Sequence, residues 1–421
     1  MPSKTPAEQH EHNILKFPEG FLWGCATSAY QVEGGNNFSD WGDAAGDACD
    51  QYNRYETDFD LAKSLNQNAH RLSIEWSRIE PKDGQFDQSA IDHYKSVLKA
   101  LKDRGFTVML TLWHFTLPKW VTDAGGWENS QTPNLFERFV KKIVPEIGEY
   151  VDLWVTINEP GVYMYETYIQ RVWPNAKKSF FGQIKTYLNL ASAHRRAYKY
   201  LHSIYPAGKP VGIANNVMSF SAFHKHSIVE QFAVYINDLF TNHLFYFLTR
   251  KTHDFLGINY YFHARFRHRG LLPESVYETP ISHEVSDLGW EIYPEGIYDA
   301  LTDLSDDIPI YITECGIAST NDDRRNRFLI TYLSEVARAI KSGCNVRGFF
   351  YWSLLDNFEW HRGFDPRFGL IEVDYATQKR IPRPSAKVYA EIIKNNGIPH
   401  KLLRFIGHTV TAQEVLERMK R

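Results

Sequence analysis

The sequence is poor in cysteine and has no long apolar run. Its four cysteines, Cys25, Cys49, Cys315 and Cys344, lie far apart and show no Cys-x-x-Cys spacing. A disulfide framework or a zinc site is therefore not expected, and free thiols in a reducing cytoplasm fit better. No stretch of about 20 apolar residues occurs, so we expect no transmembrane helix. The polar N-terminus also lacks the apolar segment of a secretory signal.

The chain has no surplus of either charge. Its 421 residues include 47 Lys and Arg against 50 Asp and Glu, for a net charge of −3. This balance gives no electrostatic case for nucleic acid or a membrane surface as partner. The 17 histidines show no His-Glu-x-x-His spacing, and we expect neither a metal nor another cofactor. The expected partner is a small molecule. These features neither predict nor exclude a homo-oligomer.

Aromatic residues, in contrast, are abundant, with 11 Trp, 24 Tyr and 27 Phe. A core with many large side chains would explain such numbers. A sugar site would also explain them, because the C–H faces of a pyranose pack on aromatic rings. The count alone favours the core.

Short runs rich in β-branched and aromatic residues alternate with helical patterns along the chain. Eight such runs are predicted strands, and they begin at Phe21, Ala69, Thr107, Leu153, Pro210, Asp254, Ile308 and Asn345. They are apolar on both faces, as strands of a covered parallel sheet are. Alternating strands and helices indicate βαβ units, and eight of these close a (β/α)₈ TIM barrel. We predict an α/β fold with a single domain over residues 1–421, of which 1–16 form a flexible or loosely packed extension.

Two stretches carry apolar residues at helical spacing. Residues 87–104 form one predicted helix, and residues 326–341 form another that ends near Gly343. Both lie between predicted strands, as the barrel requires.

Polar or aromatic residues stand at or near the ends of most predicted strands. They are Gln31, Arg71, His114, Asn158, Glu159, Asn259, Tyr260, Glu314 and Trp352. The carboxyl ends of the strands of a (β/α)₈ barrel meet at one mouth, where active sites lie. We therefore expect these residues, far apart in sequence, to lie close together.

Glu159 and Glu314 follow or end the fourth and seventh predicted strands. Cleavage of a glycosidic bond needs one carboxyl to protonate the leaving oxygen and a second on the opposite face of the sugar. In a retaining enzyme the second carboxylate attacks the anomeric carbon, with the two groups roughly 5–5.5 Å apart. Either Glu alone could be an ordinary loop residue, but two at one mouth favour this chemistry.

Several motifs resemble those of family 1 glycoside hydrolases, a family of β-glucosidase-like retaining enzymes. TINEP at 156–160 and ITECG at 312–316 are similar to the two catalytic signatures of that family. Further similar segments, in the same order, are FLWGCATSAYQVEGG, RLSIEWSRI, DFLGINYY, GWEIYPEGIYDAL and YWSLLDNFEW. The resemblance runs from about Phe17 to about Asn395 and implies hydrolysis of β-linked glucosides, and of galactosides or fucosides, from the non-reducing end.

The resemblance also implies a role for each matching residue. Glu159 matches the acid/base and Glu314 the nucleophile, while Arg71 and Tyr260 match the groups that keep the nucleophile ionised and oriented. A nearby Arg favours the carboxylate form, which gives Arg71 a physical reason for this role. The residues that match sugar-binding positions are Gln31, His114, Asn158, Tyr260, Glu359 and Trp360, with Trp352 as the aromatic floor.

The sequence departs from the family pattern in three places. His114 lies in WHFTLP rather than HWDLP, and Cys315 replaces the Asn that usually follows the nucleophile. For Cys315 we favour a packing role as a small buried residue. The stretch from Asn215 to Lys251 is short, which implies an open entrance and a tolerant leaving-group site.

Three alternative functions are disfavoured by the sequence. A 6-phospho-β-glycosidase is disfavoured because Glu359 would repel a phosphate. A catalytically inactive sugar-binding relative is disfavoured because both carboxylates are present. A metal-dependent barrel hydrolase has no supporting ligand cluster in the sequence. Glycone preference, aglycone preference and oligomeric state are not determined by these motifs.

Overall fold

Eight parallel strands close into a barrel at the centre of the molecule. The structure, a computed structural model, describes residues 14–206, 208–269, 272–276, 283–305 and 308–406. The barrel strands are β2 (Leu22–Ala26), β3 (Ala69–Ser73), β4 (Thr107–Trp113), β5 (Leu153–Asn158), β6 (Val211–Ala222), β7 (Leu256–Arg269), β9 (Ile310–Cys315) and β10 (Val346–Trp352). Each pairs in parallel with the next, and β10 pairs with β2, which completes the ring. The predicted (β/α)₈ fold is confirmed.

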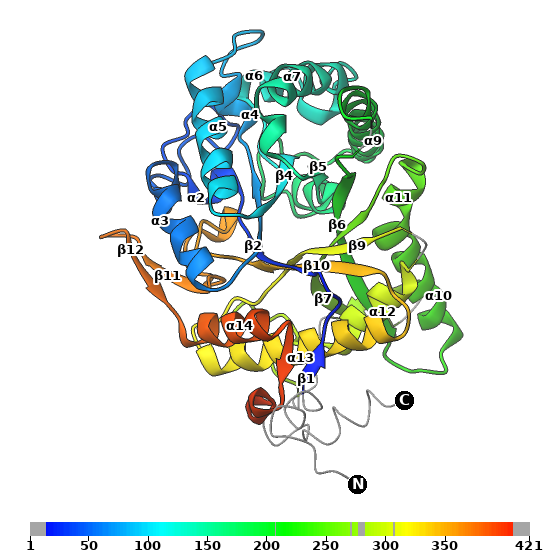
Figure 1. Ribbon diagram of the computed structural model, residues 1–421. Helices are drawn as coiled ribbons and strands as arrows, with labels where there is room; N and C mark the ends of the chain where they lie inside the picture. The colour runs from blue at the N-terminus through cyan, green and yellow to red at the C-terminus, as the bar shows by residue number, and fades with distance from the viewer. Residues whose placement is uncertain (1–13, 207, 270–271, 277–282, 306–307, 407–421) are drawn as a thin grey trace.

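Helices surround this barrel (Figure 1). The α-helices are α2 (Ala29–Val32), α3 (Gln51–Ser64), α4 (Trp76–Ile79), α5 (Gln88–Asp103), α6 (Lys119–Asp123), α7 (Thr132–Ile147), α8 (Pro160–Met164), α9 (Phe180–Ile204), α10 (Ile228–Asp238), α11 (Leu244–Leu248), α12 (Glu295–Asp303), α13 (Asp322–Lys341) and α14 (Pro384–Asn395). Two π-helical segments, η3 (Tyr165–Gln170) and η4 (Leu239–His243), and four 3₁₀ segments, η1 (Gly126–Glu128), η2 (Gly148–Tyr150), η5 (Trp360–Arg362) and η6 (His400–Phe405), complete the helical elements.

The two predicted helices show how local sequence sets their limits. The Asp87 carboxylate accepts hydrogen bonds from the backbone of Ser89 and Ala90, so it caps the first turn of α5 as the pattern predicts. Helix α13 begins at Asp322, four residues before the predicted start, because Asn321 caps it. It ends before Gly343, whose φ of 104° suits a glycine.

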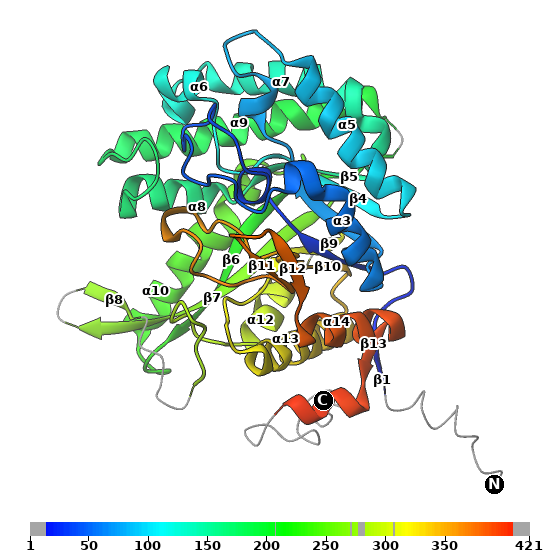
Figure 2. The ribbon, with the colours of Figure 1, turned by 90° about the vertical axis from the view of Figure 1, so that its left-hand side faces the viewer.

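Strands β6 and β7 extend well past the barrel. Their pairing continues to Ala222 opposite Phe266, and β8 (Leu272–Val276) adds to β7 in antiparallel fashion. The sequence predicted only the first parts of these strands. Beyond the mouth of the barrel, β6 and β7 satisfy each other's backbone hydrogen bonds, so the two strands can continue there as a pair. Helix α10 lies alongside this pair (Figure 2).

Two small antiparallel pairs lie outside the barrel. Strand β11 (Ile371–Asp374) pairs with β12 (Lys379–Pro382), and β1 (Ile14–Lys16) pairs with β13 (Gly397–Pro399). The expectation of a loose extension over residues 1–16 is therefore wrong for 14–16, because backbone pairing fixes them. Residues 1–13 lie outside the described part of the chain. Within that described part, no helix combines the length and the apolar character needed to cross a bilayer.

Candidate active site

The carboxyl ends of the barrel strands bring the predicted residues to one mouth. Arg71 lies in β3, Asn158 ends β5, Glu314 lies in β9 and Trp352 ends β10. The others are His114 and Glu159, which directly follow β4 and β5, Gln31 in α2, and Glu359 and Trp360 at the start of η5. A continuous set of hydrogen bonds and ring contacts joins these residues. Tyr260 is the exception among the predicted ones.

Glu314 is held by two donors. Its Oε1 accepts a hydrogen bond of 2.5 Å from Arg71 Nη1, and its Oε2 accepts one of 2.8 Å from the Tyr261 hydroxyl. Arg71 also donates to the backbone oxygen of Thr313 and to Asn158 Oδ1. Both side chains of the ion pair are almost fully buried, so water screens it little. The carboxylate is thereby fixed in one orientation.

The prediction that Tyr260 supports the nucleophile is wrong. Tyr260 is buried on the other side of β7, where its hydroxyl donates to the backbone oxygen of Tyr293. Tyr261 is the residue that reaches Glu314. Successive side chains of a strand point to opposite faces, so Tyr261 shares the face of Asn259. That two-residue period was the signal available in the sequence.

Glu159 lies at the junction of β5 and α8. Its backbone has a φ of 42°, an uncommon conformation for a residue other than glycine, and Pro160 opens the helix that follows. Its Oε1 accepts a hydrogen bond of 2.8 Å from Asn259 Nδ2. Asn259 is fixed because its own Oδ1 accepts from the Thr313 hydroxyl. Asn259 also pairs in register with Glu314, so it links the strands of the two carboxylates.

The surroundings push the two carboxyl groups toward different protonation states. Burial, and then the negative charge of Glu314, hold the pKa of Glu159 well above its usual range. Burial also raises the pKa of Glu314, but the Arg71 charge and the Tyr261 hydrogen bond oppose that rise. Only one proton donor is needed at this site, and Glu159 is the group favoured to hold the proton.

The environment of His114 defines its tautomer. Asn158 Oδ1 accepts from Arg71 and Asn259, so Asn158 Nδ2 faces His114 and donates to its Nε2 at 3.3 Å. Burial and the Arg71 charge lower the pKa of His114 well below its usual value, so the ring is neutral. Its proton therefore lies on Nδ1, which is buried and has no hydrogen-bond partner among the described residues. A ligand hydroxyl could accept this hydrogen bond.

Aromatic rings and a second carboxyl group line the far end of the site. The His114 ring lies nearly parallel to Trp352 and to Trp360, at centroid distances of 5.9 and 6.3 Å. Gln31 Nε2 donates to the Phe358 backbone oxygen at 2.8 Å and lies 3.4 Å from Glu359 Oε2. Burial, and then the Glu314 charge, raise the pKa of Glu359 to about 8. This end offers rings for packing and several polar groups for hydroxyls.

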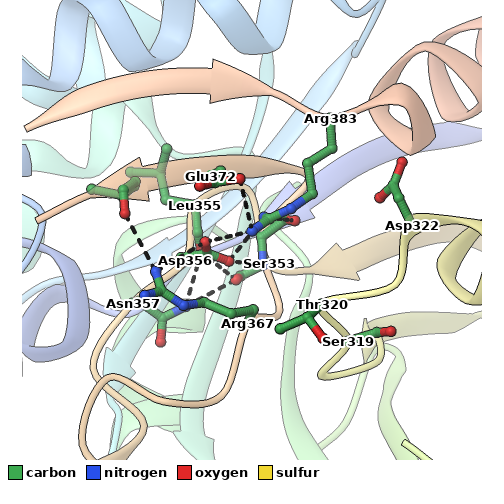
Figure 3. Close-up of polar contacts among 12 residues, drawn as sticks. Ser319, Thr320, Asp322, Ser353, Leu355, Asp356, Asn357, Arg367, Glu372 and Arg383 are labelled. Carbon is green, nitrogen blue, oxygen red and sulfur yellow. Dashed lines mark hydrogen bonds and ion pairs between the residues drawn. The ribbon is translucent and has the colours of Figure 1, made fainter. Parts of the chain in front are cut away.

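A buried ion pair anchors the loop that carries these groups. Asp356 accepts two hydrogen bonds from Arg383, at 3.0 and 2.8 Å, and lies 3.4 Å from Arg367 (Figure 3). Its neighbour Asn357 accepts a hydrogen bond of 3.0 Å from Gln31. Sequence reasoning missed this anchor, because Arg383 lies beyond the motif and its contact depends on the fold.

The residues after Glu314 are selected by close packing. Cys315 is fully buried, and burial raises the pKa of its thiol well above the usual value, which agrees with a packing role. A Cβ atom at Gly316 would lie 1.7 Å from the Trp352 backbone oxygen, so only glycine fits there. All four cysteines are buried and unpaired.

One group of described residues has the geometry to hold a cation. Asp238, His243 and Asp303 offer ligand atoms within 4.8 Å of one another. These residues lie in η4 and in the neighbouring helices α10 and α12, and His243 already pairs with Asp303 at 2.7 Å. They contact none of the residues at the mouth described above, so nothing links them to its chemistry.

Comparisons with known proteins agree with this geometry. The sequence model of Glycosyl hydrolase family 1 matches residues 14–246 and 239–398 of this chain. Beta-glucosidase A of Thermotoga maritima is 31% identical over 92% of this chain and 99% of that protein. A beta-galactosidase of Sulfolobus acidocaldarius is 30% identical over 92% of this chain and 97% of that protein.

Solved structures give the same result in three dimensions. The beta-glycosidase from Pyrococcus horikoshii superposes with a TM-score of 0.88 and 37% identity, over 94% of this chain and 98% of that one. The Thermotoga maritima beta-glucosidase in complex with deoxynojirimycin has a TM-score of 0.84 and 31% identity, over 91% and 99%.

Proposed function

The chain belongs to Glycosyl hydrolase family 1 and is a retaining β-glycosidase, and from that premise we propose that Glu314 is its nucleophile and Glu159 its acid/base. The observation that carries this assignment is the different support of the two carboxyl groups. Glu314 has a buried arginine and a tyrosine hydroxyl as donors. Glu159 has, among the described residues, the neutral amide of Asn259 as its hydrogen-bond donor, and it faces the charge of Glu314.

The reaction follows from these protonation states. Glu159 gives its proton to the glycosidic oxygen while Glu314 attacks the anomeric carbon, and an ester forms as the aglycone leaves. The ester is neutral, so the pKa of Glu159 falls and it can then accept a proton from water. That water attacks the anomeric carbon, releases the sugar with its β configuration and restores the Glu314 carboxylate. Arg71 and Tyr261 stabilise the carboxylate as it departs.

The substrates are β-glucosides cleaved from the non-reducing end, and also galactosides and fucosides. The related β-glucosidases and β-galactosidases support the glucosides and galactosides in this range. Gln31, His114, Asn158, Glu359 and Trp360 bind the sugar hydroxyls, and Trp352 packs against its ring. The neutral His114 donates from Nδ1 to a sugar oxygen, since that buried atom has no partner in the part of the chain that the structure describes.

Glu359 also bears on the phosphorylated alternative. A carboxyl group at this end of the site, beside Gln31, suits paired hydroxyls and disfavours a phosphate. A cytoplasmic location is supported by the four unpaired, buried thiols. The entrance near α10 tolerates varied aglycones.

The stereochemistry of the first product tests the proposed function. Proton NMR during hydrolysis of 4-nitrophenyl β-glucoside should show the β anomer of glucose first, followed by slow mutarotation. The Glu314→Gln variant, which keeps the shape but not the charge, should release no sugar. Initial formation of the α anomer, or full activity of that variant, would refute the assignment.

A further inference from the structure

Exposed apolar side chains are concentrated in one part of the chain. Among the residues that the structure describes, eighteen large hydrophobic side chains are exposed, and sixteen of them lie between Tyr165 and Phe247. Single exposed apolar residues are normal, but a group of this size indicates an interaction surface. Phe180, Phe181 and Ile228 are the most exposed, at 70%, 74% and 82%.

These side chains form stripes on three successive helical segments. Residues three or four apart on a helix share one face, and the exposure of these side chains shows that each stripe faces solvent. The stripes are Tyr165, Ile169 and Val172 from η3 onward, Phe180, Phe181, Ile184 and Leu188 on α9, and Ile228, Val229, Phe232, Tyr235 and Leu239 on and after α10. We call these residues together the apolar face.

The apolar face lies beside the entrance to the active site. Segment η3 and the start of α9 follow β5, and α10 follows β6. Strands β5 and β6 are neighbours in the barrel, and α10 packs on the parts of β6 and β7 that continue beyond the mouth. Figure 2 shows α8, α10 and the far end of β7 on the same side of the molecule.

The charge of this region differs from that of the whole chain. Residues 165–251 contain eleven Lys and Arg but only three Asp and Glu, while the complete sequence has 47 and 50. Exposed basic residues alternate with the apolar stripes at Arg171, Lys177, Lys178, Lys185 and Lys225. The net charge of −3, which argued against a membrane partner, averages out this local excess.

We propose that the apolar face docks on the surface of an anionic lipid bilayer. Apolar and aromatic side chains with lysines around them are typical of helices that lie in the membrane interface. Each lysine near an anionic surface adds favourable attraction. A second copy of this chain fits less well, because a two-fold interface would set these lysines against each other. Docking by this face turns the entrance of the active site toward the bilayer.

Sedimentation with vesicles tests this proposal. The full-length protein should bind vesicles rich in phosphatidylglycerol and bind pure phosphatidylcholine vesicles far more weakly. Ile228→Ser with Phe232→Ser should lower the partition coefficient by about tenfold or more, through lost apolar burial. Reversal of Lys178, Lys185 and Lys225 to Glu should lower it by at least about a hundredfold, at about fivefold per lysine.

Two controls separate docking from misfolding and from self-association. Ile381→Ser removes an apolar side chain that is 41% exposed on β12, and it should leave vesicle binding unchanged. All variants should hydrolyse a water-soluble aryl glycoside at the wild-type rate. Equal binding to both vesicle types, or none to either, would overturn the proposal. A second result would also overturn it: light scattering shows a wild-type dimer, the Ile228→Ser with Phe232→Ser variant is monomeric, and neither the wild type nor that variant binds vesicles.

Discussion

Replacement of Tyr261 by Phe removes one hydrogen bond from Glu314 and leaves the ring in place. The hydroxyl lies 2.8 Å from Oε2 of a buried carboxylate, and a hydrogen bond to a charged group contributes about 1.5–3 kcal/mol. At about 1.4 kcal/mol for each tenfold change in rate, kcat/KM should fall by about 10- to 100-fold. The Tyr260→Phe variant is the matched control. Among the described residues its hydroxyl donates a hydrogen bond to the Tyr293 backbone oxygen and none to Glu314, so kcat/KM should change by less than about threefold.

The pH dependence of the same variants gives a second measure. Tyr261 stabilises the ionised form of Glu314, so its loss raises the pKa of that group. Activity requires the ionised nucleophile, and the acidic limb of kcat/KM should therefore move to higher pH. At about 1.36 kcal/mol per pKa unit, the expected shift is about one to two units. Kinetics on 4-nitrophenyl β-glucoside across pH would measure both effects. A large loss and a shifted limb in Tyr260→Phe, with neither in Tyr261→Phe, would refute the geometry described here.

Three further predictions concern the acid/base, the glycone end and the loop anchor. Glu159→Ala should slow alkyl glycosides far more than activated aryl glycosides, and azide should restore turnover of the latter and yield the β-glycosyl azide; equal loss on both substrates would contradict this role. Glu359→Ser should lower kcat/KM on glucosides and raise the relative rate on a 6-phosphoglucoside; a wild-type preference for the phosphorylated substrate would be incompatible with our account. Asp356→Asn removes the buried carboxylate charge that pairs with Arg383, at a cost of about 3–5 kcal/mol. At about 2.1 cal/mol/K per residue over 421 residues, Tm should fall by about 3–6 °C. Glu372→Gln, which alters a carboxylate that is 48% exposed and 3.6 Å from Arg383, should change Tm by less than about 1 °C, and an equal fall in both would argue against the anchor.

The barrel could be predicted because its signals are local. Each strand is a short apolar run, and each helix shows its own period and cap, as Asp87 does for α5. The extensions of β6 and β7 were missed because their sequence is no longer apolar on both faces beyond the barrel. Their stability there comes from pairing with each other, which depends on the fold rather than on local pattern.

The site could be predicted in its main parts and failed at one position. Each motif offered a single residue for the acid/base, for the nucleophile and for the arginine beside it. In the motif NYY, however, two adjacent tyrosines offered the same chemistry, and only the orientation of β7 decides between Tyr260 and Tyr261. The Asp356 to Arg383 pair joins residues 27 positions apart through a buried loop, and no spacing rule reveals such a contact.

Surface properties were the least predictable from composition. The net charge described the whole chain, whereas binding depends on charges that share one face. Apolar residues at positions 180, 181, 184 and 188 show an ordinary amphipathic period in sequence. Only the structure tells that this side of α9 points away from the barrel.

The identity of the nucleophile is tested most directly by trapping the covalent intermediate. A 2-deoxy-2-fluoro-β-glucoside with a good leaving group forms the glycosyl-enzyme ester. This ester hydrolyses slowly, because the fluorine destabilises the transition state of the second step. Mass spectrometry of the digested protein should find one label per chain, on Glu314. Label on any other residue, or inactivation without a covalent adduct, would contradict the proposed mechanism.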